Sequence, residues 1–189
     1  MRLITWFPVL SAVLWLMLRI SASSYLDVHA GMNLGVFSNI LIILVLVFVS
    51  LLTHHRNSPA QVVGTSFMED FKRTLKYCLI FVLSSGVAMG LYYGLFSNDI
   101  SKIRDTSMEA FQSMLQDSVA RADFITQHQE LVGKSDDMLI ADYRSQLESN
   151  VTVHSRIIGS VFALLVVSLA YSLLGVVIWR NFMRSGKTR

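Results

Sequence analysis

Side chains that could bind a metal ion or catalyse a reaction are few and scattered along the chain. The histidines are His29, His54, His55, His128 and His154. No two of them have the i, i+4 spacing with which one helix holds a metal ion, and His128 and Glu130 would face apart on a helix. A single cysteine, Cys78, excludes a cysteine-cluster site and an intrachain disulfide. The sequence therefore predicts no bound metal and no cofactor.

The aspartates Asp136, Asp137 and Asp142 form a second candidate, because carboxylates attract divalent cations. A calcium loop needs a glycine at a fixed turn position, and this stretch has none there. Paired aspartates also suit the N-terminus of a helix, where they meet the positive end of its dipole. The pattern favours a solvated helix start.

Serines inside apolar segments are a third candidate, because intramembrane proteolysis can use a serine nucleophile. They are Ser84, Ser85, Ser160, Ser168 and Ser172. That chemistry needs a base at a similar depth, and the third and fourth apolar segments contain no His, Lys, Asp or Glu. We expect these serines to bond to neighbouring helices or to their own backbone, and we expect no enzyme.

The composition indicates the kind of element that must position these side chains. The 189 residues are 53% hydrophobic and 15% charged, with a mean hydropathy of +0.51. A soluble domain has about a quarter charged residues, so the chain is predicted to be an integral membrane protein. A spanning helix needs roughly 20 mostly apolar residues. The predicted transmembrane segments are about 3–20, 34–53, 75–96 and 157–179.

The first segment has two interpretations. It lies between Arg2 and Arg19, which suits a spanning helix whose arginines extend to the two interfaces. A basic start, an apolar run and the small residues "SASS" also suit a cleaved signal peptide. Trp6, Pro8 and Trp15 are unusual in a signal core, which favours a retained helix.

The distribution of lysine and arginine predicts the topology, because cytoplasmic loops carry the excess of these residues. The second-to-third linker and the tail are basic: Arg56, Lys72, Arg73, Lys76, Arg180, Arg184, Lys187 and Arg189. The polar excursion 97–156 holds ten acidic and six basic residues. We expect both termini in the cytoplasm and the excursion outside, in a bacterial inner membrane.

The excursion has the periodicity of amphipathic helices. Its first apolar run is Met108, Phe111, Leu115, Val119, Ala122 and Ile125, at steps of three and four. Thr106 and Glu109 have capping-box spacing and predict the start of that helix. A second run, Ile140, Tyr143, Leu147 and Val151, follows Ser135 and the paired aspartates. The fold class is therefore all-α: four transmembrane helices in two hairpins, with a helical extracytoplasmic excursion between the third and fourth.

The order of short motifs resembles a known family. "GMNLGVF" opens the second segment and "HHRN" closes it, while "GTSFMEDFK" leads into the third and "YYGLFSNDI" leaves it. Over about residues 31–185 the chain resembles a bacterial family of small, uncharacterised four-helix membrane proteins, a domain of unknown function. The resemblance implies four spanning helices in a cytoplasmic membrane, and it implies no activity and no functional residue.

Small residues recur at helical spacing in the last two apolar segments. They are Gly86, Gly90 and Gly94 in the third, and Ser168, Ser172 and Gly175 in the fourth. Small residues four apart let helix backbones approach closely in lipid. We expect the two faces to pack together within one chain. A homo-oligomer held through the glycines is the competing interpretation.

The functional hypothesis from sequence is a non-enzymatic structural or accessory membrane protein. Its partners would be the lipid bilayer and a membrane or periplasmic protein that binds the excursion, and no nucleic acid is expected. The alternative is a small oligomeric channel or carrier. The absence of an ionisable residue between the ends of the three clearest segments argues against a proton-coupled carrier. Asn39 is the most polar side chain within them.

Overall fold

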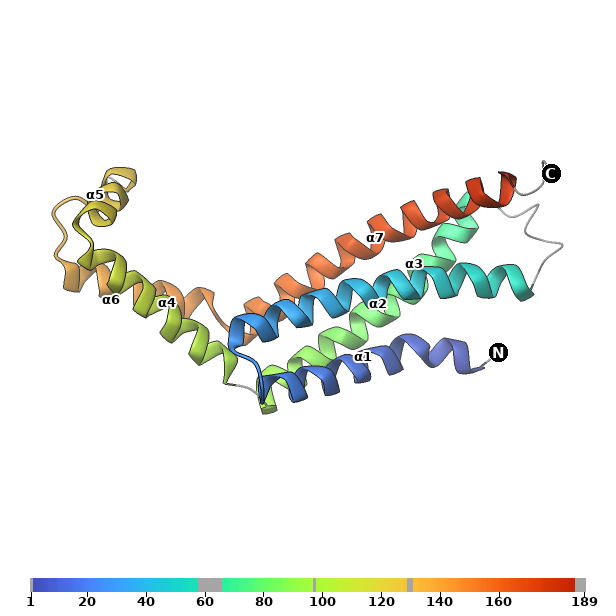
Figure 1. The fold of residues 1–189 in the computed structure, drawn as a ribbon, viewed down its shortest axis with the longest axis horizontal. Helices are drawn as coiled ribbons and strands as arrows, with labels where there is room; N and C mark the ends of the chain where they lie inside the picture. Colours follow the sequence, from blue (N-terminus) through green and yellow to red (C-terminus); the bar gives the residue numbers. More distant parts are fainter. Residues whose placement is uncertain (1, 58–65, 97, 129–130, 186–189) are drawn as a thin grey trace.

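A computed structural model describes residues 2–57, 66–96, 98–128 and 131–185, and these are helical apart from short turns and connections (Figure 1). These residues contain no strand. The α-helices are α1 (Arg2–Ser23), α2 (Val28–Asn57), α3 (Phe67–Leu91), α4 (Asp99–Gln116), α5 (Ser118–Gln127), α6 (Asp136–Asn150) and α7 (Val153–Ser185), and a π-helical turn, η1 (Tyr92–Phe96), extends α3.

Four of these helices are long and apolar enough to cross a membrane, which confirms this part of the predicted fold class. The spans are Trp6–Ser23, Val28–Thr53, Phe67–Leu95 and Val153–Phe182. The helices α2, α3 and α7 extend past the predicted apolar segments, because their polar ends continue the same backbone hydrogen-bond pattern. α1 begins and α7 ends at one end of the bundle, here called the termini end (Figure 1). α4 begins at the other, the excursion end.

α3 is the central helix of the bundle. It packs against α1, α2 and α7, most extensively against α7, and α2 also packs against α1 and α7. The shared core consists of side chains that are at most 2% exposed, among them Phe81, Val82, Ile43, Leu46 and Val176.

The outer surfaces of the spanning helices are apolar as well. Phe37 on α2, Val87 on α3 and Phe162 on α7 are each about two-thirds exposed, at 65%, 67% and 67%. A soluble protein rarely exposes so continuous an apolar surface, whereas lipid tails solvate it readily. The bundle therefore has the apolar outer surface that a membrane-spanning bundle requires.

Several helices begin at side-chain caps. Ser66 and Glu69 form a capping box at the start of α3, within the sequence "GTSFMEDFK". Asp117 accepts hydrogen bonds from the backbone N–H groups of Val119 and Ala120 and starts α5. Ser135 caps α6, and Asp136 and Asp137 occupy its first turn. The predicted helix start at the paired aspartates is confirmed.

The predicted start of the first excursion helix is wrong. Thr106 lies inside α4, which begins seven residues earlier at Asp99. The apolar run through Ile125 is also not one helix, because the extended backbone of Asp117 separates α4 from α5. Capping-box spacing arises readily inside a helix, since residues three apart share a face there.

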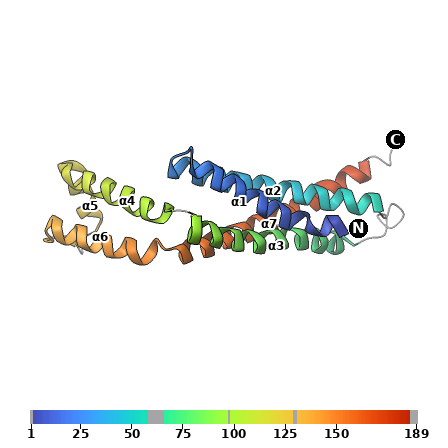
Figure 2. The ribbon, with the colours of Figure 1, turned by 90° about the horizontal axis from the view of Figure 1, so that it is seen from below.

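The helices α4, α5 and α6 form a polar module that projects beyond the excursion end, as Figures 1 and 2 both show. α4 packs against α6, with Phe111, Leu115 and Leu139 buried between them. The rings of Phe111 and Tyr143 stack with centroids 4.1 Å apart. The module thus has a small core of its own, separate from the core of the bundle.

Candidate functional site

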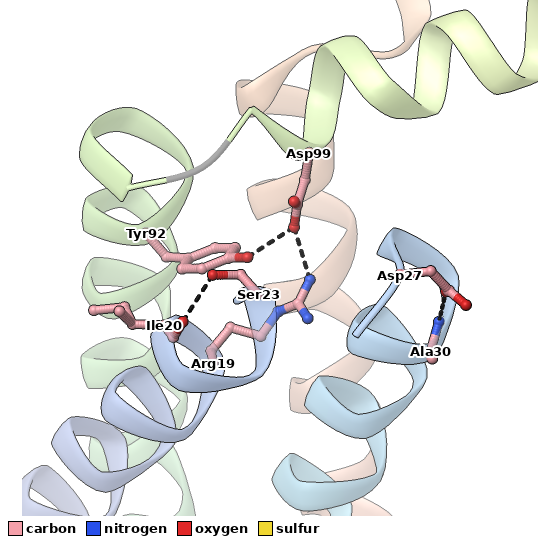
Figure 3. Close-up of polar contacts among 7 residues, drawn as sticks. All are labelled: Arg19, Ile20, Ser23, Asp27, Ala30, Tyr92 and Asp99. Carbon is pink, nitrogen blue, oxygen red and sulfur yellow. Dashed lines mark hydrogen bonds and ion pairs between the residues drawn. The ribbon is translucent and has the colours of Figure 1, made fainter. Parts of the chain in front are cut away.

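The most strongly buried charges in the described chain form an ion pair at the excursion end. Arg19 Nη2 of α1 lies 2.9 Å from Asp99 Oδ2, at the first residue of α4, and these side chains are 3% and 7% exposed. Tyr92 of η1 donates its hydroxyl proton to the same carboxylate oxygen over 2.8 Å (Figure 3). The guanidinium of Arg19 also lies 4.9 Å from the centre of the Tyr92 ring. One carboxylate thereby joins α1, η1 and α4.

Two glycines of α2 make room for this arginine. A Cβ atom at Gly31 would lie 2.5 Å from Arg19 Nη1, and one at Gly35 would lie 3.4 Å from Arg19 Cδ. Trp15, one turn before Arg19, donates its indole N–H to the Gly35 carbonyl over 3.0 Å. The motif "GMNLGVF" therefore serves the close approach of α1 to α2.

Arg19 does not extend outward into water, as the sequence-based expectation of an interfacial arginine requires. Arg19 as a residue is only 2% exposed, because Asp99 and Tyr92 enclose its charge within the protein. The long side chain turns toward the centre of the bundle, where a carboxylate neutralises it.

A pocket of about 490 Å³ lies beside the ion pair. α2 and α7 supply most of its lining, while Trp15, Arg19 and Met89 close it from the sides of α1 and α3. Figure 2 shows α2 and α7 farther apart at the excursion end than at mid-length. Val36 and Gly159, both exposed, also line the pocket, which therefore reaches the surface of the bundle between α2 and α7.

Polar groups in the pocket are unevenly satisfied. Asn39 is 3% exposed, and its Oδ1 has no hydrogen-bond partner among the described residues. Arg156, half-buried at the pocket, makes no side-chain hydrogen bond and no ion pair with any residue of the described ranges. The pocket combines an acceptor that lacks a donor with a cation that lacks a counter-charge.

Buried polar side chains continue from the pocket toward the termini end. Ser85 and Ser168 are fully buried, and their hydroxyl oxygens have no partner among the described residues. Ser172 donates to the sulfur of Cys78 over 3.8 Å. Further along, Ser50 contacts Thr74 over 3.4 Å and Arg180 pairs with Asp70 over 3.8 Å. We call this row the polar seam.

The small residues singled out from the sequence face more than one neighbour. A Cβ at Gly86 would lie 3.1 Å from Val161 of α7, and one at Gly90 would lie 3.9 Å from Ile157 of α7. A Cβ at Gly94 would meet nothing within 4 Å.

On α7, Ser168 and Ser172 are fully buried, and the hydroxyl of Ser172 meets Cys78 of α3. Gly175 instead faces Val47 of α2 so closely that a Cβ there would clash. The structure therefore brings four of the six residues to the contact between α3 and α7 or into the core beside it. It places Gly175 at a different contact, between α2 and α7.

Within the described residues, no three His, Cys, Asp or Glu side chains lie close enough together to hold a metal ion. The side chains of His54 and His55 lie outside what the structure describes. Ser84 donates to the carbonyl of Ile80 in its own helix, and Ser172 donates to Cys78. No hydrogen bond in the described chain joins any of the five singled-out serines to a basic side chain.

Sequence reasoning missed the ion pair because its partners are 80 residues apart, and Asp99 was counted among the charges of a solvated excursion. One sequence signal could have predicted this ion pair: Arg19 lies near the end of one span, and Asp99 lies just after the end of another. Asn39 was noticed as polar, and the structure places it in the pocket.

Comparison with protein-family models, curated proteins and solved structures finds no match for this chain. The resemblance to a bacterial family stays a prediction.

Proposed function

We propose that the protein is a non-enzymatic accessory protein of a bacterial inner membrane, and that the module α4–α6 is the part that binds a partner protein. The four spanning helices anchor it, with both termini in the cytoplasm and the module outside. The observation that carries this proposal is a module with its own core, held at a fixed place on an apolar bundle.

The attachment of the module supports a role in presenting a surface. Arg104 of α4 donates from Nε to the Val151 carbonyl over 2.9 Å, and from Nη2 to the Glu148 carbonyl over 3.2 Å. These bonds join α4 to the end of α6, close to the point where α7 begins. The Arg19–Asp99 pair fixes the start of α4 from the opposite side. A merely tethered domain would need neither contact.

The far side of the module offers apolar side chains to a partner. Val119 on α5 is 69% exposed, Val132 in the turn before α6 is 68% exposed, and Met138 on α6 is 55% exposed. α5 has no fully buried residue, and Phe124 joins it to the module core through an edge-on contact with Phe111, with ring centroids 5.6 Å apart. We propose that these side chains contribute to one contact surface, because a partner protein buries apolar side chains at the core of an interface.

The proposal is tested by placing a photo-crosslinking amino acid at Val119 or Val132 in the full chain in native membranes. We expect both positions to yield a discrete crosslinked protein band, identified by mass spectrometry. Leu83, 67% exposed on α3, is the control position and should crosslink to lipid only. If neither module position yields a protein and deletion of residues 106–150 changes nothing measurable, the proposal fails.

A small oligomeric channel or carrier is the second candidate, and the polar seam below the pocket is the observation that favours it. Against it, Phe81, Val82 and Ile43 are fully buried beside the seam and fill the interior of the bundle. Purified protein in liposomes should therefore leave ion and water flux at background. Flux that a substitution of buried Ser168 by leucine abolishes would favour the channel over the accessory role.

A further inference from the structure

The pocket beside Arg19 has the composition of a ligand site, and of the module α4–α6 only Asn150, at the end of α6, lines it. Its volume of about 490 Å³ is within the range of sites that bind small molecules, roughly 300–1,000 Å³. Apolar side chains such as Trp15, Met89 and Leu164 make up most of the lining, and a few polar groups converge on it. Such a lining fits a molecule that is partly apolar and partly charged.

One of the two positive charges at the pocket has no negative charge to neutralise it among the described residues. Arg19 is neutralised by Asp99 at 2.9 Å, whereas Arg156 has no ion-pair partner among the described residues. A half-buried arginine is a strong donor to phosphate and carboxylate groups. The ligand therefore carries a negative charge, and this charge meets Arg156.

The buried acceptor specifies a second feature of the ligand. Asn39 Oδ1 lacks a hydrogen-bond partner in the described chain, although Asn39 is 3% exposed and lines the pocket. An acceptor in such a position needs a donor. A hydroxyl group on the ligand supplies one without adding a second charge.

The route into the pocket indicates where the ligand comes from. Exposed Val36 and Gly159 line it, so it opens to the surface of the bundle between two spanning helices. In a membrane that surface is covered by lipid at the level of the headgroups.

We propose that the pocket binds the headgroup of an anionic, hydroxyl-bearing phospholipid, such as phosphatidylglycerol. Arg156 holds the phosphate, Asn39 accepts the headgroup hydroxyl, and the acyl chains lie along the apolar surfaces of α2 and α7.

The test is native mass spectrometry of the purified full chain with added lipids of defined headgroup. Phosphatidylglycerol should bind more tightly than zwitterionic phosphatidylcholine by about fivefold, the effect of one arginine near a headgroup with a net negative charge, because the choline ammonium of phosphatidylcholine cancels the charge of its phosphate. Arg156→Gln should reduce this difference to the part that the headgroup hydroxyl supplies through Asn39. Arg144→Gln removes the same charge from an exposed position of α6, outside the pocket lining, and should leave the difference intact.

Two further comparisons separate a true pocket from general attraction to charge. Gly159→Leu should fill the pocket, since a Cβ there meets nothing within 4 Å, and should abolish bound phosphatidylglycerol. Gly94→Leu is equally unhindered but outside the pocket lining, and should change nothing. Asn39→Leu should equalise phosphatidylglycerol and phosphatidylmethanol, which is anionic but has no headgroup hydroxyl.

The proposal is overturned if phosphatidylglycerol and phosphatidylcholine bind equally, or if Arg144→Gln weakens binding as much as Arg156→Gln. It is also overturned if glycerol 3-phosphate competes at the same concentration as the lipid, because the ligand would then be a soluble phosphate ester. Circular dichroism and gel filtration of each variant show that the fold is retained.

Discussion

At the residue scale, Arg19 and Asp99 form the most deeply buried ion pair among the residues that the structure describes. Both side chains are more than nine-tenths buried, and the carboxylate serves Arg19 and Tyr92 at once. Charges removed from water in this way depend on each other, because either one alone would stay desolvated and uncompensated. The pair therefore favours the one arrangement of α1 and α4 in which both charges are paired, and it does so more strongly than the Coulomb attraction between the two charges alone would.

Substitution of one member of the pair should lower the stability of the protein far more than substitution of both members. Asp99→Asn or Arg19→Met alone should lower the free energy of unfolding by about 3–5 kcal/mol, because a buried charge loses its partner. The double variant should recover most of that loss. Unfolding with denaturing detergent, followed by circular dichroism, measures the difference.

The pair Lys134–Asp142 is the matched control, with side chains 33% and 52% exposed. Lys134→Met should change stability by about 1 kcal/mol or less. A double variant at Arg19 and Asp99 no more stable than the worse single variant would contradict the coupling of these charges.

A second consequence at this scale concerns Cys78. It is fully buried against Ser172, so its sulfur faces α7 of the same chain. Oxidative crosslinking of the unaltered protein in native membranes should give no disulfide-linked dimer on a non-reducing gel. A cysteine introduced at exposed Leu83 tests whether α3 meets another copy through its outer side. Efficient dimers through Cys78 would contradict the packing of α3 against α7.

At the element scale, the bundle is joined by small residues that serve different helix pairs. Gly86 and Gly90 leave room on α3 for side chains of α7. Gly175 leaves room on α7 for Val47 of α2. Gly31 and Gly35 leave room on α2 for the side chain of Arg19 of α1. In lipid the hydrophobic effect does not drive helices together, so close van der Waals packing at small residues must hold them.

Gly175→Leu should separate α2 from α7 at the termini end. A Cβ there would clash with Val47, so we expect a loss of about 1–3 kcal/mol in the free energy of unfolding, typical of an overpacked core. Val47→Ala in the same chain should restore part of the loss. Gly94→Leu should be nearly neutral, since its Cβ meets nothing within 4 Å. Equal losses for the two glycine substitutions would refute this assignment.

At the scale of the whole molecule, the helix order places the module at one end, and the start of α1 and the end of α7 at the other (Figure 1). The basic residues near the termini end and the acidic excess of 97–156 predict which end faces the cytoplasm. A periplasmic reporter inserted near Lys134 should be active, and one fused after Arg189 should be inactive. Colony assays of both fusions check this, and the opposite pair of results would reverse the topology.

The sequence predicts the parts of this fold that depend on local pattern. Unbroken apolar length predicts the four spans, and Ser135 with its aspartates predicts the start of α6. Thr106 and Glu109 have the same spacing as the actual capping box at Ser66 and Glu69, and spacing alone does not reveal which residue has a non-helical backbone.

The candidate site was mostly unpredictable, because it depends on contacts between distant segments. Arg19 meets Asp99 only when α1 and η1 lie side by side, and Asn39 lines a pocket only because α2 and α7 diverge. Apolar periodicity indicates which residues of a helix face the protein interior, but it does not indicate which other helix that face will contact.

The burial of Arg19 has a consequence for how the protein is made. α1 is the least apolar of the four spanning helices, and its arginine emerges from the ribosome 80 residues before the aspartate that neutralises it. Until Asp99 is synthesised, the insertion machinery must hold a helix whose charge has no partner in the membrane. Correct assembly of α1 therefore waits for the start of α4, and a chain truncated before Asp99 would leave α1 prone to quality-control proteolysis.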